Sequence, residues 1–345
     1  MLAEEVAYVL GVDTHTDSHA IAIVETGRQK VEGSVSIPAT RRGYRQALRL
    51  ARLRAPGQRL WALEGTGSYG SGLARFLDSR GERVLEVERP RREGSRGRLK
   101  SDPLDAERAA RAALSGAAGA APRLSPQTQA LRALLVAREG AVTASRAARN
   151  ELGALILTAP PELRERLQGL PRAALIETCA RLRPGTDSER AAVALALRSL
   201  ALRVRHLNEE AKELEQELAT RVQALAPALL ARRGVGPICA SWLLVAWSEP
   251  GRLRSEAAFA RLAGVAPIPA SSGKLVRHRL DRGGDRRLNR ALHTIVLGLR
   301  RTDAETQAYI ARRVSEGKTQ REAVRCLKRY LARSLFRQLE AMPRA

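Results

Sequence analysis

The sequence is poor in aromatic residues and cysteine, and it has no long apolar run. Only 3% of its 345 residues are Phe, Trp or Tyr, so base stacking on exposed rings, as in many single-strand binders, is not expected to dominate. Cys179, Cys239 and Cys326 lie far apart and fit neither a disulfide framework nor a zinc site. No apolar run approaches the roughly 18–20 residues that a membrane helix needs.

Acidic residues are few beside basic ones. The chain has 60 Lys and Arg against 36 Asp and Glu, a net charge of +24, which indicates a polyanionic partner, above all nucleic acid. Codon bias explains why most of these cations are Arg, but it does not explain their surplus over carboxylates. Because Glu4 and Glu5 stand where a signal peptide would be basic, we expect a cytoplasmic, nucleoid-associated protein.

The hydrophobic pattern predicts a first domain at residues 1–116. Apolar alternation and helical spacing indicate three strands, a helix, a strand, a helix, a strand and a helix. The strands are expected at 7–13, 19–25, 31–37, 60–64 and 83–88, and the helices at 41–54, at about 70–80 and from Pro103. This order resembles an α/β RNase H-like (RuvC-like) domain.

The remaining chain is predicted to be mostly helical. After a linker at 117–123, residues 117–232 read as a helical or coiled-coil region, in which 188–226 form one long helix. This helix pairs either with another protomer or with its own chain. A third domain at 233–345 opens on Gly234-Val235-Gly236, which is either a plain turn or part of a helix-hairpin-helix-like element that offers backbone N–H groups to phosphate.

Four carboxylates in the first domain form the main candidate site. Asp13 and Glu64 end apolar strand-like runs, and Asp102 and Asp105 open a helix. With Pro103 at the first helical position, Asp102 suits the N-cap and Asp105 lies one turn away on the same side. An ordinary helix start is the alternative for this pair. Carboxylates gathered in a cationic protein suggest a divalent, two-metal site that acts on a polyanion.

Two neighbouring histidines and two basic segments add candidates. His15 and His19 are interpreted as structural or as outer residues of the metal site, because hard oxygen ligands favour Mg²⁺. Serines precede Gly273 in the third domain and are phosphate ligands, turn residues or a nucleophile. The expected nucleic-acid contacts are Arg91, Arg92, Arg96, Arg98, Lys100, Lys274, Arg277, Arg279 and Arg282.

Together these motifs resemble the DEDD-type transposases of the IS110 insertion-sequence family and the related pilin-gene invertases. Their order and spacing match over nearly the whole chain, with Thr16 as one departure where relatives often have Lys. The matching pieces are Gly11-Val12-Asp13 with His15 and Asp17-Ser18-His19, Glu64 to Tyr69, Lys100-Ser101-Asp102 with Asp105-Ala106, Gly264 to Pro267, Ser271 to Lys274, and Asp285 to Leu292.

The resemblance implies a DNA transposase or recombinase. It implies Mg²⁺ held by Asp13, Glu64, Asp102 and Asp105, and a nucleophilic serine that maps onto Ser272, with Ser271 the weaker candidate. It further implies a covalent phosphoserine link to DNA, and a structured guide (bridge) RNA that pairs with double-stranded donor and target DNA. The active form is expected to be a tetramer, a dimer of dimers, whose composite sites join two protomers.

Two other functions remain open from the sequence. A RuvC-like metal-dependent nuclease or junction resolvase would use the same carboxylates and hydrolyse DNA with water, leaving Ser272 to bind phosphate. A non-enzymatic architectural binder of DNA or RNA would need none of the carboxylates.

Overall fold

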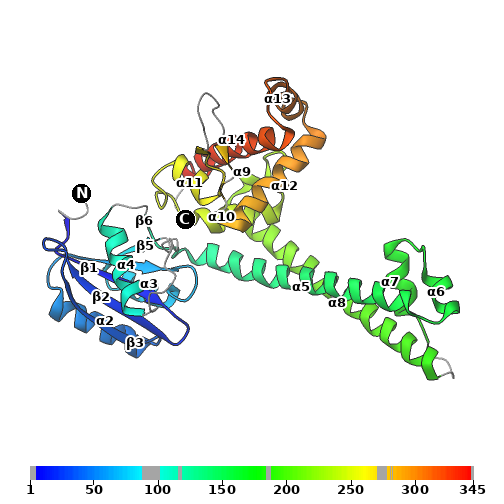
Figure 1. Ribbon diagram of the computed structural model, residues 1–345, viewed down its shortest axis with the longest axis horizontal. Coiled ribbons are helices and arrows are strands. Elements are labelled where there is room, and N and C mark those ends of the chain that lie inside the picture. The colour runs from blue at the N-terminus through cyan, green and yellow to red at the C-terminus, as the bar shows by residue number, and fades with distance from the viewer. Residues whose placement is uncertain are drawn as a thin grey trace. The chain divides into compact units, whose positions relative to one another are not determined.

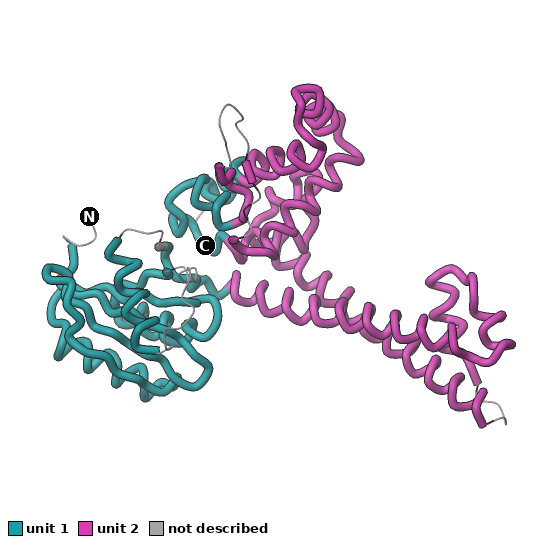
Figure 2. The backbone as a smooth tube through the Cα atoms, viewed as in Figure 1, with its two compact units in different colours: residues 1–126, 247–262, 333–345 teal, residues 127–246, 263–332 magenta. Residues whose placement is uncertain are grey.

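The computed structural model describes residues 5–87, 102–115, 119–183, 188–269, 278–279, 281 and 283–342. Backbone packing divides the chain into two compact units (Figure 2), each assembled from separate stretches of sequence. The first unit comprises residues 1–126, 247–262 and 333–345, and the second comprises 127–246 and 263–332. The division into 1–116, 117–232 and 233–345 stays a prediction.

A six-stranded mixed sheet forms the centre of the first unit (Figure 1). The strands are β1 (Tyr8–Thr14), β2 (Ser18–Glu25), β3 (Val31–Pro38), β4 (Arg59–Glu64), β5 (Arg83–Val87) and β6 (Gly119–Ala120), in the order β3-β2-β1-β4-β5-β6. β1 runs antiparallel to β2 and parallel to β4. The five predicted strands are confirmed, whereas β6 was expected to be linker and instead pairs with β5.

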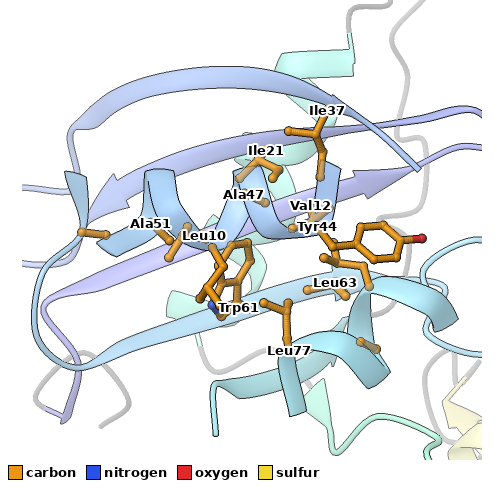
Figure 3. Packing of buried hydrophobic residues seen from close by; sticks show 14 of the residues in the cluster. Leu10, Val12, Ile21, Ile37, Tyr44, Ala47, Ala51, Trp61, Leu63 and Leu77 are labelled. Carbon is orange, nitrogen blue, oxygen red and sulfur yellow. The ribbon is translucent and has the colours of Figure 1, made fainter. Parts of the chain in front are cut away.

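Helices cover both faces of this sheet, because its central strands are apolar on both sides. Helices α2 (Arg41–Arg54) and α3 (Ser71–Asp78) pack on one face, against Leu10, Val12, Trp61 and Leu63 (Figure 3). Helix α4 (Asp102–Leu114) packs on the other face, against Val9, Leu60 and Ala62. A mixed sheet with helices so placed fits the RNase H-like fold. α4 begins at Asp102, one residue earlier than predicted.

Gly11 allows α4 to lie directly on β1. A Cβ atom at this position would stand 2.0 Å from the carbonyl oxygen of Ala106 and 2.5 Å from the amide nitrogen of Ala110. Both atoms belong to backbone, so neither can rotate away. The absence of a side chain at Gly11 therefore sets the distance between β1 and the helix that carries Asp102.

Replacing Gly11 by alanine is expected to lower the free energy of unfolding by about 1–3 kcal/mol, because the methyl group overpacks this contact. Urea denaturation of the purified protein measures the change. Gly140→Ala is the matched control, because Gly140 lies in a helix and nothing is within 4 Å of a Cβ atom there. This substitution is expected to stabilise the helix by up to about 1 kcal/mol. Equal effects of the two substitutions would contradict the contact argument.

Two later stretches of the chain complete the first unit. The buried guanidinium of Arg252 donates to Glu86 Oε2 at 2.7 Å and to the carbonyl oxygen of Ala121 at 2.9 Å. Trp247 Nε1 donates to Glu340 Oε1 at 2.6 Å. Through one buried guanidinium group, Arg252 thus contacts residues that lie 131 and 166 positions earlier in the sequence.

The second unit contains a long helical hairpin (Figure 1). Helices α5 (Pro126–Leu157) and α8 (Ser188–Leu225) lie side by side, with α6 (Pro161–Leu167) and α7 (Arg172–Ala180) between them in the chain. Ser145 Oγ contacts Asn208 Oδ1 at 2.8 Å, and Arg138 pairs with Glu215 at 2.7 Å. The predicted long helix is confirmed, and these polar residues contact their own chain. Coiled-coil pairing with another protomer stays a prediction.

Helices of 4 to 21 residues and a two-stranded hairpin make up the rest of the described chain. They are α9 (Pro227–Leu230), α10 (Pro237–Trp247), α11 (Glu256–Leu262), β7 (Ile268–Pro269), β8 (His278–Arg279), α12 (Arg286–Thr302), α13 (Ala304–Ser315) and α14 (Gln320–Glu340). The helix-hairpin-helix-like element stays a prediction. Within the described ranges, no helix has the length and apolarity needed to cross a bilayer.

Candidate metal site and serine hairpin

Asp13 and Glu64 lie next to each other at the ends of parallel strands. Val12 of β1 pairs with Leu63 of β4, so the residues that follow them stand at the same level of the sheet. Side chains alternate between the faces of a strand, and Val9, Leu60 and Ala62 face α4. Asp13 and Glu64 share their parity and therefore face α4 as well. Both residues are buried, at 2% and 5% exposure.

Asp102 approaches Asp13 from the first turn of α4. His15 lies between the two, with its Nε2 3.0 Å from Asp13 Oδ2 and 3.6 Å from Asp102 Oδ1. One possible ligand atom from each of the three residues lies within 4.8 Å of the other two. β1 and the start of α4 thus bring together side chains 89 positions apart. We call Asp13, His15 and Asp102 the Asp–His–Asp cluster.

The other two predicted carboxylates lie beside this cluster rather than in it. Asp105 is one turn further along α4, where its Oδ1 accepts a hydrogen bond from Arg108 at 2.6 Å. The backbone of Glu64 is tied to β1, because Thr14 Oγ1 donates to its carbonyl oxygen at 3.1 Å. After Glu64 the chain turns at once through Gly65, whose φ of +62° suits glycine.

The two histidines have different surroundings. His15 lies just past the end of β1 and belongs to the cluster. His19 is fully buried on the opposite face, where its ring stacks on Tyr44 at 5.9 Å between centroids. Burial lowers the pKa of His19, which favours the neutral ring. His19 is therefore a core residue, consistent with its structural interpretation.

The Asp–His–Asp cluster and its neighbours have the chemistry of a divalent-cation site. The side chain of Asp13 is only 3% exposed, and a buried carboxylate is costly unless a cation accompanies it. Across the described ranges, Asp13 forms an ion pair with His15 and none with a Lys or Arg. Carboxylate oxygens from two elements, with Glu64 and Asp105 adjacent, match the ligands that hard divalent cations prefer.

The segment that carries the predicted nucleophile is bracketed by a small hairpin. Ile268 pairs with Arg279 and Pro269 with His278, so β7 and β8 flank residues 270–277. We call the β7–β8 pair the serine hairpin. Arg279 is exposed in β8. The other predicted serine and nucleic-acid positions lie outside the described residues, namely Ser271, Ser272, Lys274, Arg277, Arg282, Arg91, Arg92, Arg96, Arg98 and Lys100.

Comparisons with known proteins connect these two regions. A family model described as "Transposase", of the DEDD type of IS110 elements, matches residues 10–161, which include the Asp–His–Asp cluster, Glu64 and Asp105. A second model, "Transposase IS116/IS110/IS902 family", matches residues 226–311 and includes the serine hairpin. A DEDD transposase domain implies a divalent metal–carboxylate site, in agreement with the cluster.

A curated relative points the same way. The chain is 30% identical over 209 residues to the "Insertion element IS110 uncharacterized 43.6 kDa protein" of Streptomyces coelicolor. The match covers 59% of this chain and 50% of that relative, so the chain spans about half the length of the curated relative that it matches. With two family models in the expected order and this relative in agreement, the chain belongs to the IS110 family of transposases.

Proposed function

We propose that this protein is a DNA transposase that cuts and rejoins strands of an insertion sequence. The observation that carries the proposal is the convergence of Asp13 from β1 and Asp102 from α4 around His15. Buried Glu64 stands beside Asp13 on the same face of the sheet, and Asp105 follows Asp102 by one turn. The family membership supports DNA as the substrate.

The four carboxylates Asp13, Glu64, Asp102 and Asp105 would hold divalent cations, which we take to be two Mg²⁺ ions. A cation bound there supplies polarisation of the scissile phosphate and stabilisation of the leaving oxygen. The protein's own contribution is to fix these oxygens on rigid elements. β1 and β4 are central strands, and Gly11 holds α4 against them.

Ser272 is the proposed nucleophile. Its Oγ forms a bond to the scissile phosphorus as the bond from phosphorus to one DNA oxygen breaks. The proton lost from Oγ leaves through solvent, and the released DNA strand gains one as its hydroxyl. The resulting phosphoserine diester retains the bond energy of the original link, so a second DNA hydroxyl can displace Ser272 and rejoin the strands without a nucleotide cofactor.

The proposed partners are double-stranded donor and target DNA together with a structured guide RNA. The charge of +24 and the scarcity of aromatic residues favour contacts from Arg to phosphate, while base pairing by the RNA would supply sequence specificity. The proposed assembly is a tetramer in which the carboxylates of one protomer serve the Ser272 of another.

Trapping a covalent protein–DNA adduct tests this function. The wild-type protein is incubated with Mg²⁺, a supercoiled plasmid carrying the gene's own flanking DNA, and RNA transcribed from that DNA. Denaturing gels should show a protein–DNA adduct, and mass spectrometry should locate a nucleotide remnant on the peptide containing Ser272. Nicked DNA without an adduct would favour the hydrolytic nuclease or junction resolvase instead.

A further inference from the structure

Lys328 is a buried cation in α14. It is only 7% exposed, and its Nζ donates to Asn289 Oδ1 at 2.6 Å. Over the part of the chain that the structure describes, no carboxylate pairs with it. Burial lowers the pKa of this ammonium, so the position costs free energy that a surface lysine would not. The side chain of Asn289 is the group that it contacts.

Asn289 of α12 links Lys328 to the backbone at residues 263 and 264. Its Nδ2 donates to the carbonyl oxygen of Ala263 at 2.6 Å and to that of Gly264 at 3.3 Å. An ammonium group can only donate hydrogen bonds, so it must face the oxygen of the amide. Lys328 therefore fixes the orientation of Asn289, with the amide nitrogen toward the two carbonyl groups.

Gly264 is also the place where two parts of the backbone meet. Its φ is +62°, and a Cβ there would lie 2.5 Å from the carbonyl oxygen of Gly283 and 3.5 Å from that of Asp281. Asp281 Oδ1 in turn accepts a hydrogen bond from the amide of Gly283 at 2.8 Å. The segment between 264 and 283, which contains β7, β8 and Ser272, thus begins and ends at positions that are neighbours in space.

We propose that Lys328 and Asn289 are positioning residues for strand transfer. They tie Gly264, near the start of the segment that contains β7, Ser272 and β8, to helices α12 and α14. They therefore act on Ser272 through the backbone of Gly264. Neither residue touches DNA or the reacting atoms in this proposal. The inference rests on the proposed function of Ser272 as nucleophile.

Two substitutions test the pair in the full-length protein. Lys328→Met removes the ammonium that orients the amide. Asn289→Asp keeps a partner for Lys328 but replaces the donor facing Ala263 and Gly264 with a second acceptor. Misplacement of a reacting group by about 1 Å costs roughly 10²-fold in rate. We expect the rate of adduct formation at saturating plasmid to fall by about that factor, with the plasmid concentration for half-maximal rate unchanged.

Arg329→Gln is the matched control, because it removes one positive charge from an exposed neighbour on the same helix. It is expected to affect plasmid affinity and not the saturated rate. The proposal is overturned if both test variants form adduct at the wild-type rate, or if they lose affinity and saturated rate in proportion. Unfolding of both variants at the assay temperature, followed by circular dichroism, also overturns it, since the pair is then a general stability element.

Failure of the proposed function would look different. If the wild-type protein forms no adduct, Ser272 is not the nucleophile, whatever Lys328 does. Amide hydrogen exchange then still tests whether Lys328 and Asn289 hold the backbone at Gly264. Exchange should be faster at Val265 and Gly283 in both variants than in wild type. Unchanged exchange at these amides would overturn the positioning role independently of catalysis.

Discussion

Replacing Ser272 by alanine is expected to abolish the covalent protein–DNA adduct and strand exchange. Loss of a nucleophile that cannot be substituted by a neighbour costs at least about 10⁴-fold in rate. The change removes one hydroxyl and no charge, so binding to the plasmid should remain within roughly twofold of wild type because phosphate contacts dominate affinity. Adduct yield on denaturing gels and filter binding of the same plasmid measure the two quantities.

Ser271→Ala is the control for this experiment, since it removes the same group one position earlier in the chain. It is expected to retain adduct formation. An adduct that persists in Ser272→Ala and disappears in Ser271→Ala would move the nucleophile by one residue. Continued strand cleavage in the absence of either hydroxyl would sink the covalent mechanism and favour attack by water.

Asp13→Asn is expected to lower the rates of both adduct formation and any DNA cleavage by about 10³-fold. Metal-assisted charge stabilisation is worth several kcal/mol, and each 1.36 kcal/mol is a factor of ten in rate. Asparagine keeps the shape of this buried side chain but removes its charge, so the fold should survive. Single-turnover rates over a series of Mg²⁺ or Mn²⁺ concentrations measure both the rate and the metal requirement.

Asp17→Asn is the matched control, because the same chemical change occurs at an exposed position in the turn after β1. It is expected to leave rate and metal requirement unchanged. If Asp13→Asn instead has the activity of wild type at all metal concentrations, the carboxylate site is not catalytic. The architectural-binder interpretation would then account for the protein better.

Local patterns were sufficient to predict much of the first unit. β1 and β4 are apolar runs that end in Asp13 and Glu64, and strand parity places both carboxylates on the face of α4. β6 could not be predicted, because Gly119-Ala120 is too short to show a period and exists only by pairing with β5. Element order and parity are properties of local sequence, whereas the pairing of a two-residue strand is not.

Contacts between residues far apart in sequence could not be predicted from local sequence patterns. Lys328 lies on an Arg-rich helix, where a lysine is expected to be exposed to solvent. It is nevertheless buried against Asn289, 39 residues earlier. The contact between Arg252 and Glu86 joins residues 166 positions apart. Nothing in either local sequence distinguishes these residues from the many exposed cations around them. The Asp–His–Asp cluster was predictable only in part for the same reason, since Asp102 alone also suits an ordinary helix start.

The contact made by Arg252 has a consequence for biosynthesis. A nascent chain that has emerged only as far as the end of the sheet lacks the guanidinium that contacts Glu86 and Ala121. Its β5–β6 edge therefore remains incomplete until more than a hundred further residues have left the ribosome. The segment that contains Ser272 is made next, and residues 333–345, which complete the first unit, follow it. The unit that holds the four carboxylates is therefore complete only after the proposed nucleophile has been synthesised.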